Sequence, residues 1–228
     1  MPSSFPDALS VVASWVQALR PATVLDVGIG FGKYGMLFRE YLDVSPRGEH
    51  GQSYDGPSAS IRIDGIEAHE PYIGPLQRAI YDRIHVGDAL AVLPTLGRYD
   101  LIFAADVVEH FTRADGERFL AVASAHAALG VLIVTPALDL EQDDVFGNPF
   151  ERHQSFWTPD DFAVRPGADV LVWRRQLLAF VPSGTTRAPR LPRTSVREAL
   201  GQAAKAAVAG VLGTARAESL LHARRRHR

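Results

Sequence analysis

The sequence predicts an α/β fold in which a mostly parallel sheet carries helices on both faces. Short apolar runs typical of buried strands alternate with segments of helical periodicity. A turn with three alternating glycines joins the first strand to a helix. An acidic residue stands at the end of each of the first three strands, which is the edge where doubly wound sheets bind their ligands.

The elements follow from these periodicities in chain order. Residues 3–20 carry apolar residues at helical spacing, and Pro21 ends this first helix. Strands are expected at 23–27, 61–66, 83–86, 99–104, 130–134, 169–173 and 176–181, the last two as an antiparallel hairpin. Helices are expected at 33–42, 71–81, 115–129 and from Thr158 onward. Residues 46–60 are rich in Gly, Pro and Ser and should form a loop, either a surface excursion or a cover for part of the site.

Composition excludes several classes of function. The 228 residues carry a net charge of −2, so the chain has no basic footprint for nucleic acid. The absence of cysteine excludes disulfides, thiolate metal sites and cysteine nucleophiles. We expect a cytoplasmic protein, because the sequence shows no secretory signal and no run of 18 apolar residues.

The glycine turn, T-V-L-D-V-G-I-G-F-G at residues 23–32, is the most informative motif. The glycines permit a sharp turn and close approach of a ligand, and the following helix start should direct backbone N–H groups towards it. The spacing is G-x-G-x-G rather than the G-x-G-x-x-G of dinucleotide folds, and Asp26 precedes it. A carboxylate at this position repels a pyrophosphate and favours a cationic group. The α-ammonium of S-adenosylmethionine is such a group, with its carboxylate bound by the N–H groups of the turn.

Two further acids extend this site. Glu67 closes the second strand, where it can accept hydrogen bonds from both ribose hydroxyls. Asp88 closes the third strand, where it can accept from the adenine amine while the next N–H group serves a ring acceptor. The expected cofactor-binding residues are Asp26, Gly28, Gly30, Gly32, Tyr34, Glu67, Ala68, Asp88, Ala89 and Asp106.

The acceptor side is expected after the fourth strand and in the loop 138–158. His110 and His153 are the candidate catalytic residues, each as the base that removes a proton from the acceptor, the alternative being structural histidines that shape the pocket. Asn148, His153 and Trp157 are the candidate substrate residues. Asp106, Glu109 and His110 with an acid such as Asp144 can hold Mg²⁺, but no fixed ligand spacing demands it, and we assign no metal site.

With these motifs the sequence resembles the class I S-adenosylmethionine-dependent methyltransferases, in particular the type 11-like, small-molecule branch. The resemblance covers residues 23–181 and rests on V-L-D-V-G-I-G-F-G, I-D-G-I-E, V-G-D-A, Y-D-L-I-F-A-A-D-V-V-E-H-F and G-V-L-I-V-T-P, in family order. It implies a seven-stranded Rossmann-like sheet whose last strand is antiparallel. It also implies that Asp26 and the glycines hold the methionine part, Glu67 the ribose and Asp88 the adenine. No N/D-P-P-Y/F motif follows the fourth strand, which argues against methylation of the amino groups of nucleic acid bases.

The expected organisation is a methyltransferase domain at 1–182, a linker at 183–194, and an amphipathic helix with a basic tail at 195–228. That helix can dock on the domain, form a homodimer or lie on a membrane surface. The expected function is methyl transfer from S-adenosylmethionine to an O or N atom of a small-molecule acceptor. The alternatives are a non-catalytic cofactor-binding or scaffold protein of the same fold, and an NAD(P)-dependent oxidoreductase.

Overall fold

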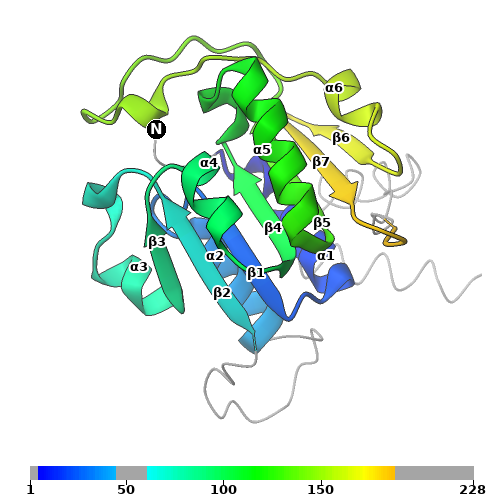
Figure 1. The fold of residues 1–228 in the computed structure, drawn as a ribbon, viewed down its shortest axis with the longest axis horizontal. Helices are drawn as coiled ribbons and strands as arrows, with labels where there is room; N and C mark the ends of the chain where they lie inside the picture. The colour runs from blue at the N-terminus through cyan, green and yellow to red at the C-terminus, as the bar shows by residue number, and fades with distance from the viewer. Residues whose placement is uncertain (1–4, 45–60, 188–228) are drawn as a thin grey trace, which may run out of the picture. The chain divides into compact units, whose positions relative to one another are not determined.

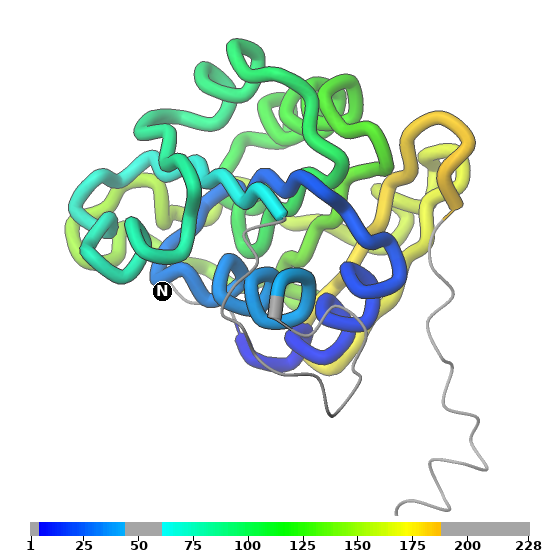
Figure 2. The backbone as a smooth tube through the Cα atoms, turned by 90° about the horizontal axis from the view of Figure 1, so that it is seen from below, coloured from blue at the N-terminus to red at the C-terminus, as the bar shows by residue number. Residues whose placement is uncertain are grey.

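The computed structural model describes residues 5–44 and 61–187. These residues form a seven-stranded sheet in the order β3-β2-β1-β4-β5-β7-β6, with helices on both faces (Figure 1). Figure 2, viewed from below, shows the blue helices α1 and α2 on one side of the strands and the green helix α5 on the other. The expected loop at 46–60 and the C-terminal helix lie outside the described residues, as do residues 188–194 of the expected linker.

The strands are β1 (Thr23–Val27), β2 (Arg62–Glu67), β3 (Arg83–Val86), β4 (Tyr99–Ala105), β5 (Ala127–Pro136), β6 (Asp169–Trp173) and β7 (Gln176–Pro182). β1 to β5 pair in parallel, and β7 runs antiparallel to both β5 and β6. The expected seven-stranded sheet with an antiparallel last strand is therefore confirmed. The central strands β1 and β4 are almost completely buried, as expected for a sheet covered on both faces.

The α-helices are α1 (Leu9–Leu19), α2 (Lys33–Phe38), α3 (Pro75–Ile80), α4 (Ala89–Val92), α5 (Arg113–His126) and α6 (Pro159–Ala163). Short 3₁₀ turns are η1 (Pro6–Ala8), η3 (Glu70–Tyr72), η4 (Leu93–Thr95), η5 (Val108–His110) and η6 (Pro149–Glu151), and a π-helical segment η2 (Arg39–Val44) continues α2. None of the described helices has the length and apolar character needed to cross a bilayer.

The helix boundaries correct several of the expected ones. The helix expected at 3–20 is α-helical only from Leu9, after the turn η1, and the helix expected at 33–42 ends at Phe38, where η2 continues it. The expected helix at 71–81 is split, because Gly74 takes an extended conformation as the N-cap of α3 and separates it from η3. The expected helix at 115–129 begins at Arg113, because the Thr112 side chain accepts a hydrogen bond from the Asp115 N–H as the N-cap. It ends at His126, where the chain already enters β5.

Candidate active site

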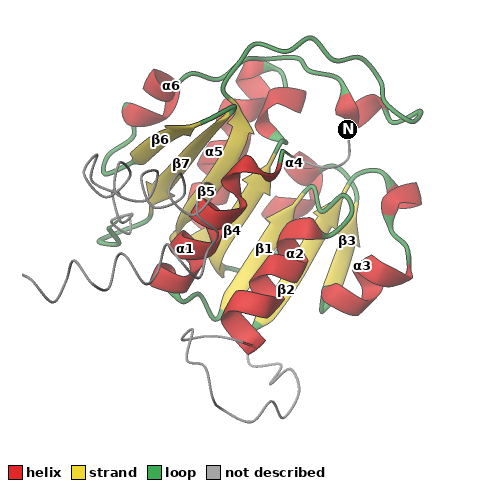
Figure 3. Cartoon of the chain, turned by 180° about the vertical axis from the view of Figure 1, so that it is seen from behind, coloured by secondary structure: helices red, strands yellow, loops and turns green. Residues whose placement is uncertain are grey.

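A cleft of about 270 Å³ opens beyond the carboxyl ends of the parallel strands. Figures 1 and 3 show the segment 137–158, which follows β5, crossing the same end of the sheet. The cleft brings together nine of the ten residues expected to bind the cofactor. They are Asp26, Gly28, Gly30, Tyr34, Glu67, Ala68, Asp88, Ala89 and Asp106.

The backbone of the glycine turn lines the cleft at Gly28 and Gly30 and packs closely against its neighbours. Gly28, Gly30 and Gly32 all have positive φ, between 48° and 80°, which a side chain would make strained. A Cβ on Gly28 would lie 2.5 Å from Val107 Cγ2, so the turn also packs without room for a side chain. Gly32 does not line the cleft; it is the N-cap of α2 and packs against Ile80.

The hydrogen bonds of this turn differ from the expectation. The N–H groups of Gly28 and Ile29 donate to the Ile66 carbonyl, and the Gly32 N–H donates to the Ile29 carbonyl. The Gly30 N–H donates to Glu67 Oε2 (3.0 Å). These four donors stabilise the turn itself, so the expectation that they bind a ligand carboxylate is wrong in this conformation.

Asp26 lies at the end of β1 and is 2% exposed. The hydroxyl of Tyr81 donates to its Oδ2 (2.6 Å). Burial raises the pKa of Asp26 to about 7, the hydrogen bond from Tyr81 lowers it, and the nearby Glu67 carboxylate raises it further. An acid with this pKa changes its charge in the neutral range, and a cationic ligand would favour its ionised form.

Glu67 is fixed by two backbone donors. Its Oε2 accepts from the Gly30 N–H, and its Oε1 accepts from the His69 N–H (2.9 Å). Burial raises its pKa, while these two hydrogen bonds lower it. Because each carboxylate oxygen has a second lone pair, the group can still accept a pair of hydroxyl groups from the cleft.

Asp88 is the N-cap of the short helix α4. Its Oδ1 accepts from the Leu90 N–H (2.7 Å), and Ala89, the first residue of the helix, lies beside it in the lining of the cleft. The acid is therefore held by local capping at the carboxyl end of β3. Sequence position alone placed it correctly, because parallel strands end at the same edge of the sheet.

The floor of the cleft near β4 contains Tyr34, Asp106 and Lys33. The Tyr34 ring packs against Phe103, with ring centroids 4.6 Å apart. Asp106 has a positive φ of 50°, a conformation that costs free energy for a non-glycine residue and is found mostly at functional sites. Burial lowers the pKa of Lys33, and the Asp106 carboxylate opposes this shift.

The cleft also has an aromatic wall that sequence reasoning identified only in part. Phe31, which follows the glycine turn, stacks on Tyr72, with centroids 6.5 Å apart. The Tyr72 hydroxyl donates to Glu151 Oε1 (3.2 Å), and Phe150 also lines the cleft. Phe31 was recognisable as a neighbour of the turn. Phe150 and Glu151 carry no local signal, because only the path of the segment 137–158 brings them there, and Tyr72 reaches the cleft through the turn η3 after β2.

The two candidate catalytic histidines lie side by side, with ring centroids 5.0 Å apart. His110 lines the cleft, whereas His153 lies behind it in a small pocket of about 10 Å³ that Glu109 also lines. Burial, with His153 as the second cause, lowers the pKa of His110 to about 4. Burial raises the pKa of Glu109 well above its ordinary value, and Asp106 adds to the shift.

Of the other residues expected to bind a substrate or a metal, only Asn148 lines the cleft, whereas Trp157 and Asp144 do not. Asn148 lines the cleft, and its side chain caps η6 by accepting from the Phe150 N–H. Trp157 does not line the cleft; it is 1% exposed and belongs to the core. Asp144, considered with Glu109 and His110 as a metal ligand, instead pairs with Arg152 (3.0 Å).

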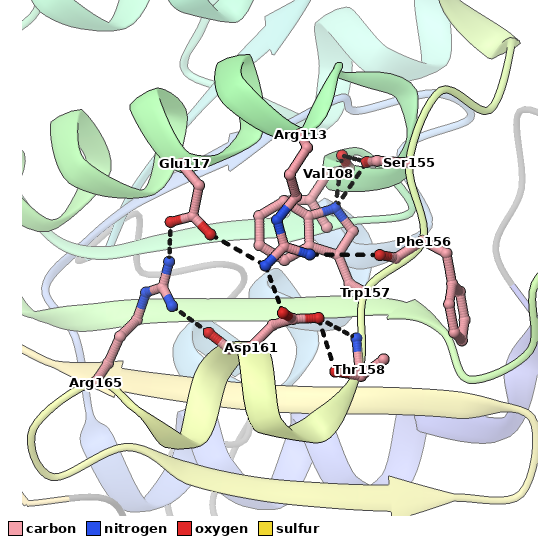
Figure 4. Close-up of polar contacts among 9 residues, drawn as sticks. All are labelled: Val108, Arg113, Glu117, Ser155, Phe156, Trp157, Thr158, Asp161 and Arg165. Carbon is pink, nitrogen blue, oxygen red and sulfur yellow. Dashed lines mark hydrogen bonds and ion pairs between the residues drawn. The ribbon is translucent and has the colours of Figure 1, made fainter.

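Trp157, Arg113, Thr158 and Asp161 form a cluster that joins the end of the segment 137–158 to α5 (Figure 4). The Arg113 guanidinium lies 4.0 Å above the Trp157 ring and binds Asp161 Oδ1 (2.5 Å). Asp161 Oδ2 accepts from both the N–H and the hydroxyl of Thr158, which closes the first turn of α6. The cluster holds the chain just after His153 in place.

Replacing Asp161 with Asn should lower the free energy of unfolding by about 1 kcal/mol at pH 7. The hydrogen bond from Arg113 and those from Thr158 hold the pKa of Asp161 well below its ordinary value. A lowered pKa stabilises the fold above the ordinary value and loses this contribution as pH falls. The difference between wild type and Asp161→Asn in thermal denaturation should therefore shrink below about pH 4.

The matched control is Asp160→Asn at the neighbouring, exposed position. It should change stability by less than half as much. Equal losses for both variants would contradict a specific role for the Asp161 contacts.

Comparisons with known proteins place the fold. No protein-family model matches the sequence, and no curated protein matches it. An O-methyltransferase family protein from Burkholderia thailandensis has a similar structure, with a TM-score of 0.54 and 13% identity over 79% of this chain. This chain spans 56% of that protein's length. A methyltransferase from Geobacter sulfurreducens gives a TM-score of 0.53 at 15% identity, covering 81% of this chain and 83% of its own. The chain therefore has the Rossmann-like fold of the methyltransferases.

Proposed function

We propose that this protein transfers a methyl group from S-adenosylmethionine to an O or N atom of a small-molecule acceptor. The observation that carries the proposal is the convergence of Asp26, Glu67 and Asp88 on one cleft, each at the end of a different strand. Their chemistry fits the three parts of this cofactor: an ammonium group, a pair of ribose hydroxyls and an adenine amine. The fold of the compared methyltransferases supports the same assignment at a coarser level.

The cofactor would supply an electrophilic methyl group on a sulfonium. The protein would contribute binding, orientation and exclusion of water. Asp26 would accept the ammonium, Glu67 the ribose, and Asp88 with the Ala89 N–H the adenine. Phe31 and Tyr72 would cover the bound molecule.

Thermal-shift measurements with S-adenosylhomocysteine, S-adenosylmethionine and NAD test the cofactor. We expect stabilisation by the first two and none by NAD, because the Asp26 carboxylate disfavours a pyrophosphate. Stabilisation by NAD alone would support the oxidoreductase instead. Binding of S-adenosylmethionine without formation of S-adenosylhomocysteine over a broad panel of hydroxyl and amine acceptors would support the non-catalytic alternative.

Affinity for S-adenosylhomocysteine should fall as the pH is lowered through about 7. The pKa of Asp26 is raised to about 7, with Tyr81 and Glu67 facing it, and only its ionised form attracts an ammonium group. Below this value the affinity should decrease by up to about tenfold per pH unit. Isothermal titration calorimetry between pH 5.5 and 8 measures this dependence.

Asp26→Asn provides the control. The amide keeps an acceptor for the Tyr81 hydroxyl, but the variant should bind weakly at every pH. Because the folded pKa is raised, ionisation of Asp26 destabilises the unliganded fold as pH rises from about 4 to 7. Unliganded Asp26→Asn should therefore be at least as stable as the wild type at pH 8. A steep pH dependence that survives in Asp26→Asn would contradict the assignment.

His110 and His153 remain the candidate catalytic residues of this proposal. His110→Ala should leave the affinity for S-adenosylhomocysteine within about threefold of wild type and lower turnover by 10²-fold or more. Full activity of His110→Ala would exclude a catalytic role. With a pKa of about 4, His110 is neutral at pH 7 and so is in the form that can take a proton from the acceptor, although it is a weaker base than a histidine of ordinary pKa.

A further inference from the structure

Three potential metal ligands lie close together where the segment 137–158 passes the turn η5 beside the cleft. One ligand atom from each of Glu109, His110 and His153 lies within 4.8 Å of the other two. Glu109 and His110 belong to η5, directly after β4, whereas His153 comes from a segment 43 residues later. The two histidines, each a candidate base by its sequence position, lie together in the fold, with ring centroids 5.0 Å apart.

Both imidazole rings are oriented by backbone carbonyl groups. Nδ1 of His110 contacts the Arg152 carbonyl (3.2 Å), and Nδ1 of His153 contacts the Leu140 carbonyl (2.5 Å). A carbonyl oxygen can only accept, so each Nδ1 must carry the proton. In the neutral rings the lone pair therefore lies on Nε2. This arrangement, with one ring nitrogen donating to a carbonyl, is the one that metal-ligating histidines almost always show.

Glu109 supplies a buried oxygen without a protein partner. Its Oε2 accepts from the Thr135 hydroxyl (2.9 Å), but its Oε1 is buried and accepts no hydrogen bond from any residue in 5–44 or 61–187. The residue is 2% exposed. A buried carboxylate oxygen without a partner costs folding free energy, and a bound cation would remove this cost.

The backbone around these side chains is held firmly. The N–H groups of Gln154 and Ser155 donate to the Glu109 carbonyl, and the His153 N–H donates to the Gln142 carbonyl. The side chain of Gln154 donates to the His110 carbonyl (2.5 Å). The ligand atoms already lie within 4.8 Å of one another, so side-chain rotations alone can bring them to the separation of about 3.4 Å that tetrahedral ligands at about 2.1 Å require.

We propose that Glu109, His110 and His153 bind a divalent transition-metal ion. Two imidazole nitrogens and one carboxylate suit Zn²⁺, Co²⁺ or Mn²⁺ far better than Mg²⁺, which prefers oxygen ligands. Three protein ligands leave at least one coordination position for another molecule. Because His110 lines the cleft, this position is accessible to an oxygen or nitrogen atom of a methyl acceptor; that part alone rests on the proposed function.

Isothermal titration calorimetry with Zn²⁺ on the full chain, purified without a polyhistidine tag and treated with a chelator, tests the site. We expect one ion per chain with a submicromolar dissociation constant, and no heat from Mg²⁺ at the same concentration. Glu109→Gln, His110→Gln and His153→Gln should each weaken binding at least 30-fold. His69→Gln, at a histidine beside the cleft but outside the cluster, should leave it unchanged.

His222 and His227 remain in every variant, so any binding at the C-terminal histidines appears as a constant background. Unchanged Zn²⁺ affinity in all three cluster variants would overturn the proposal, and so would the absence of binding by the wild type. If the variants fail to fold, X-ray absorption of the Zn²⁺-loaded wild type decides: two imidazoles and an oxygen ligand support the site, and fewer than two imidazoles refute it. The Zn²⁺ titration is made without S-adenosylmethionine, so the two proposals can fail separately. A protein that binds Zn²⁺ but not S-adenosylmethionine would refute only the proposed function.

Discussion

Glu67→Gln is expected to lower the affinity for S-adenosylhomocysteine by about 100-fold, on the order of 3 kcal/mol. The carboxylate is oriented by the Gly30 and His69 N–H groups, which leaves one lone pair on each oxygen for a ribose hydroxyl. The amide has one oxygen instead of two and no charge, so at least one charge-assisted hydrogen bond to the ligand is lost. Isothermal titration calorimetry at pH 8 measures the change.

Glu70→Gln is the matched control, because Glu70 is exposed, lies three residues away and does not line the cleft. It should bind as the wild type does. The thermal stability of unliganded Glu67→Gln must be measured alongside, since Glu67 also supports the glycine turn through Gly30. Equal affinity of Glu67→Gln and wild type would show that the ligand does not contact this carboxylate, and the three-acid interpretation of the cleft would fail.

The fold was predictable because its signals are local and repeated. Each central strand is a short apolar run, and the strand that begins at Thr23 passes directly into a glycine turn. The errors arose where one residue overrides the periodicity. Gly74 interrupts an otherwise continuous helical pattern, and Thr112 begins α5 earlier than the apolar spacing suggests.

The positions of the three acids at the cleft were also predictable, for a topological reason. Parallel strands end at one edge, so acids at the carboxyl ends of β1, β2 and β3 must lie near each other whatever the conformation of the loops. The partners of these acids were not predictable. That Tyr81 donates to Asp26, and that Gly30 donates to Glu67 instead of to a ligand, depends on how α3 and the turn pack in three dimensions.

The neighbours of His153 could not be predicted from the sequence. His110 was placed by its position after β4, but His153 lies in the segment 138–158, which has little periodicity, so its neighbours could not be derived. The structure fixes them by backbone hydrogen bonds from Gln154 and Ser155 to Glu109. These hydrogen bonds place His153 beside His110 and Glu109, so the two candidate bases and a carboxylate form one cluster.

Trp157→Ala is expected to lower the free energy of unfolding by about 3–5 kcal/mol. The indole is 1% exposed, packs against Phe162 with centroids 5.3 Å apart, and donates from Nε1 to the Val108 carbonyl (3.1 Å). Its removal leaves a cavity beneath Arg113 and takes away one of the three donors to the Val108 carbonyl in η5, the others being the Ser155 hydroxyl and the Phe111 N–H. For a chain of this size the melting temperature should fall by about 10 °C.

Trp173→Ala is the matched control, since Trp173 is 42% exposed on β6 and its loss should cost less than about 1 kcal/mol. Trp157→Phe should fall between the two, because it keeps most of the packing and loses the N–H donor. A direct substrate role predicts the opposite pattern: normal stability in Trp157→Ala with a raised KM. The tryptophan follows His153 by four residues and contacts η5 through Val108. If it anchors this segment, Trp157→Ala should also weaken Zn²⁺ binding, whereas Trp173→Ala should leave it unchanged.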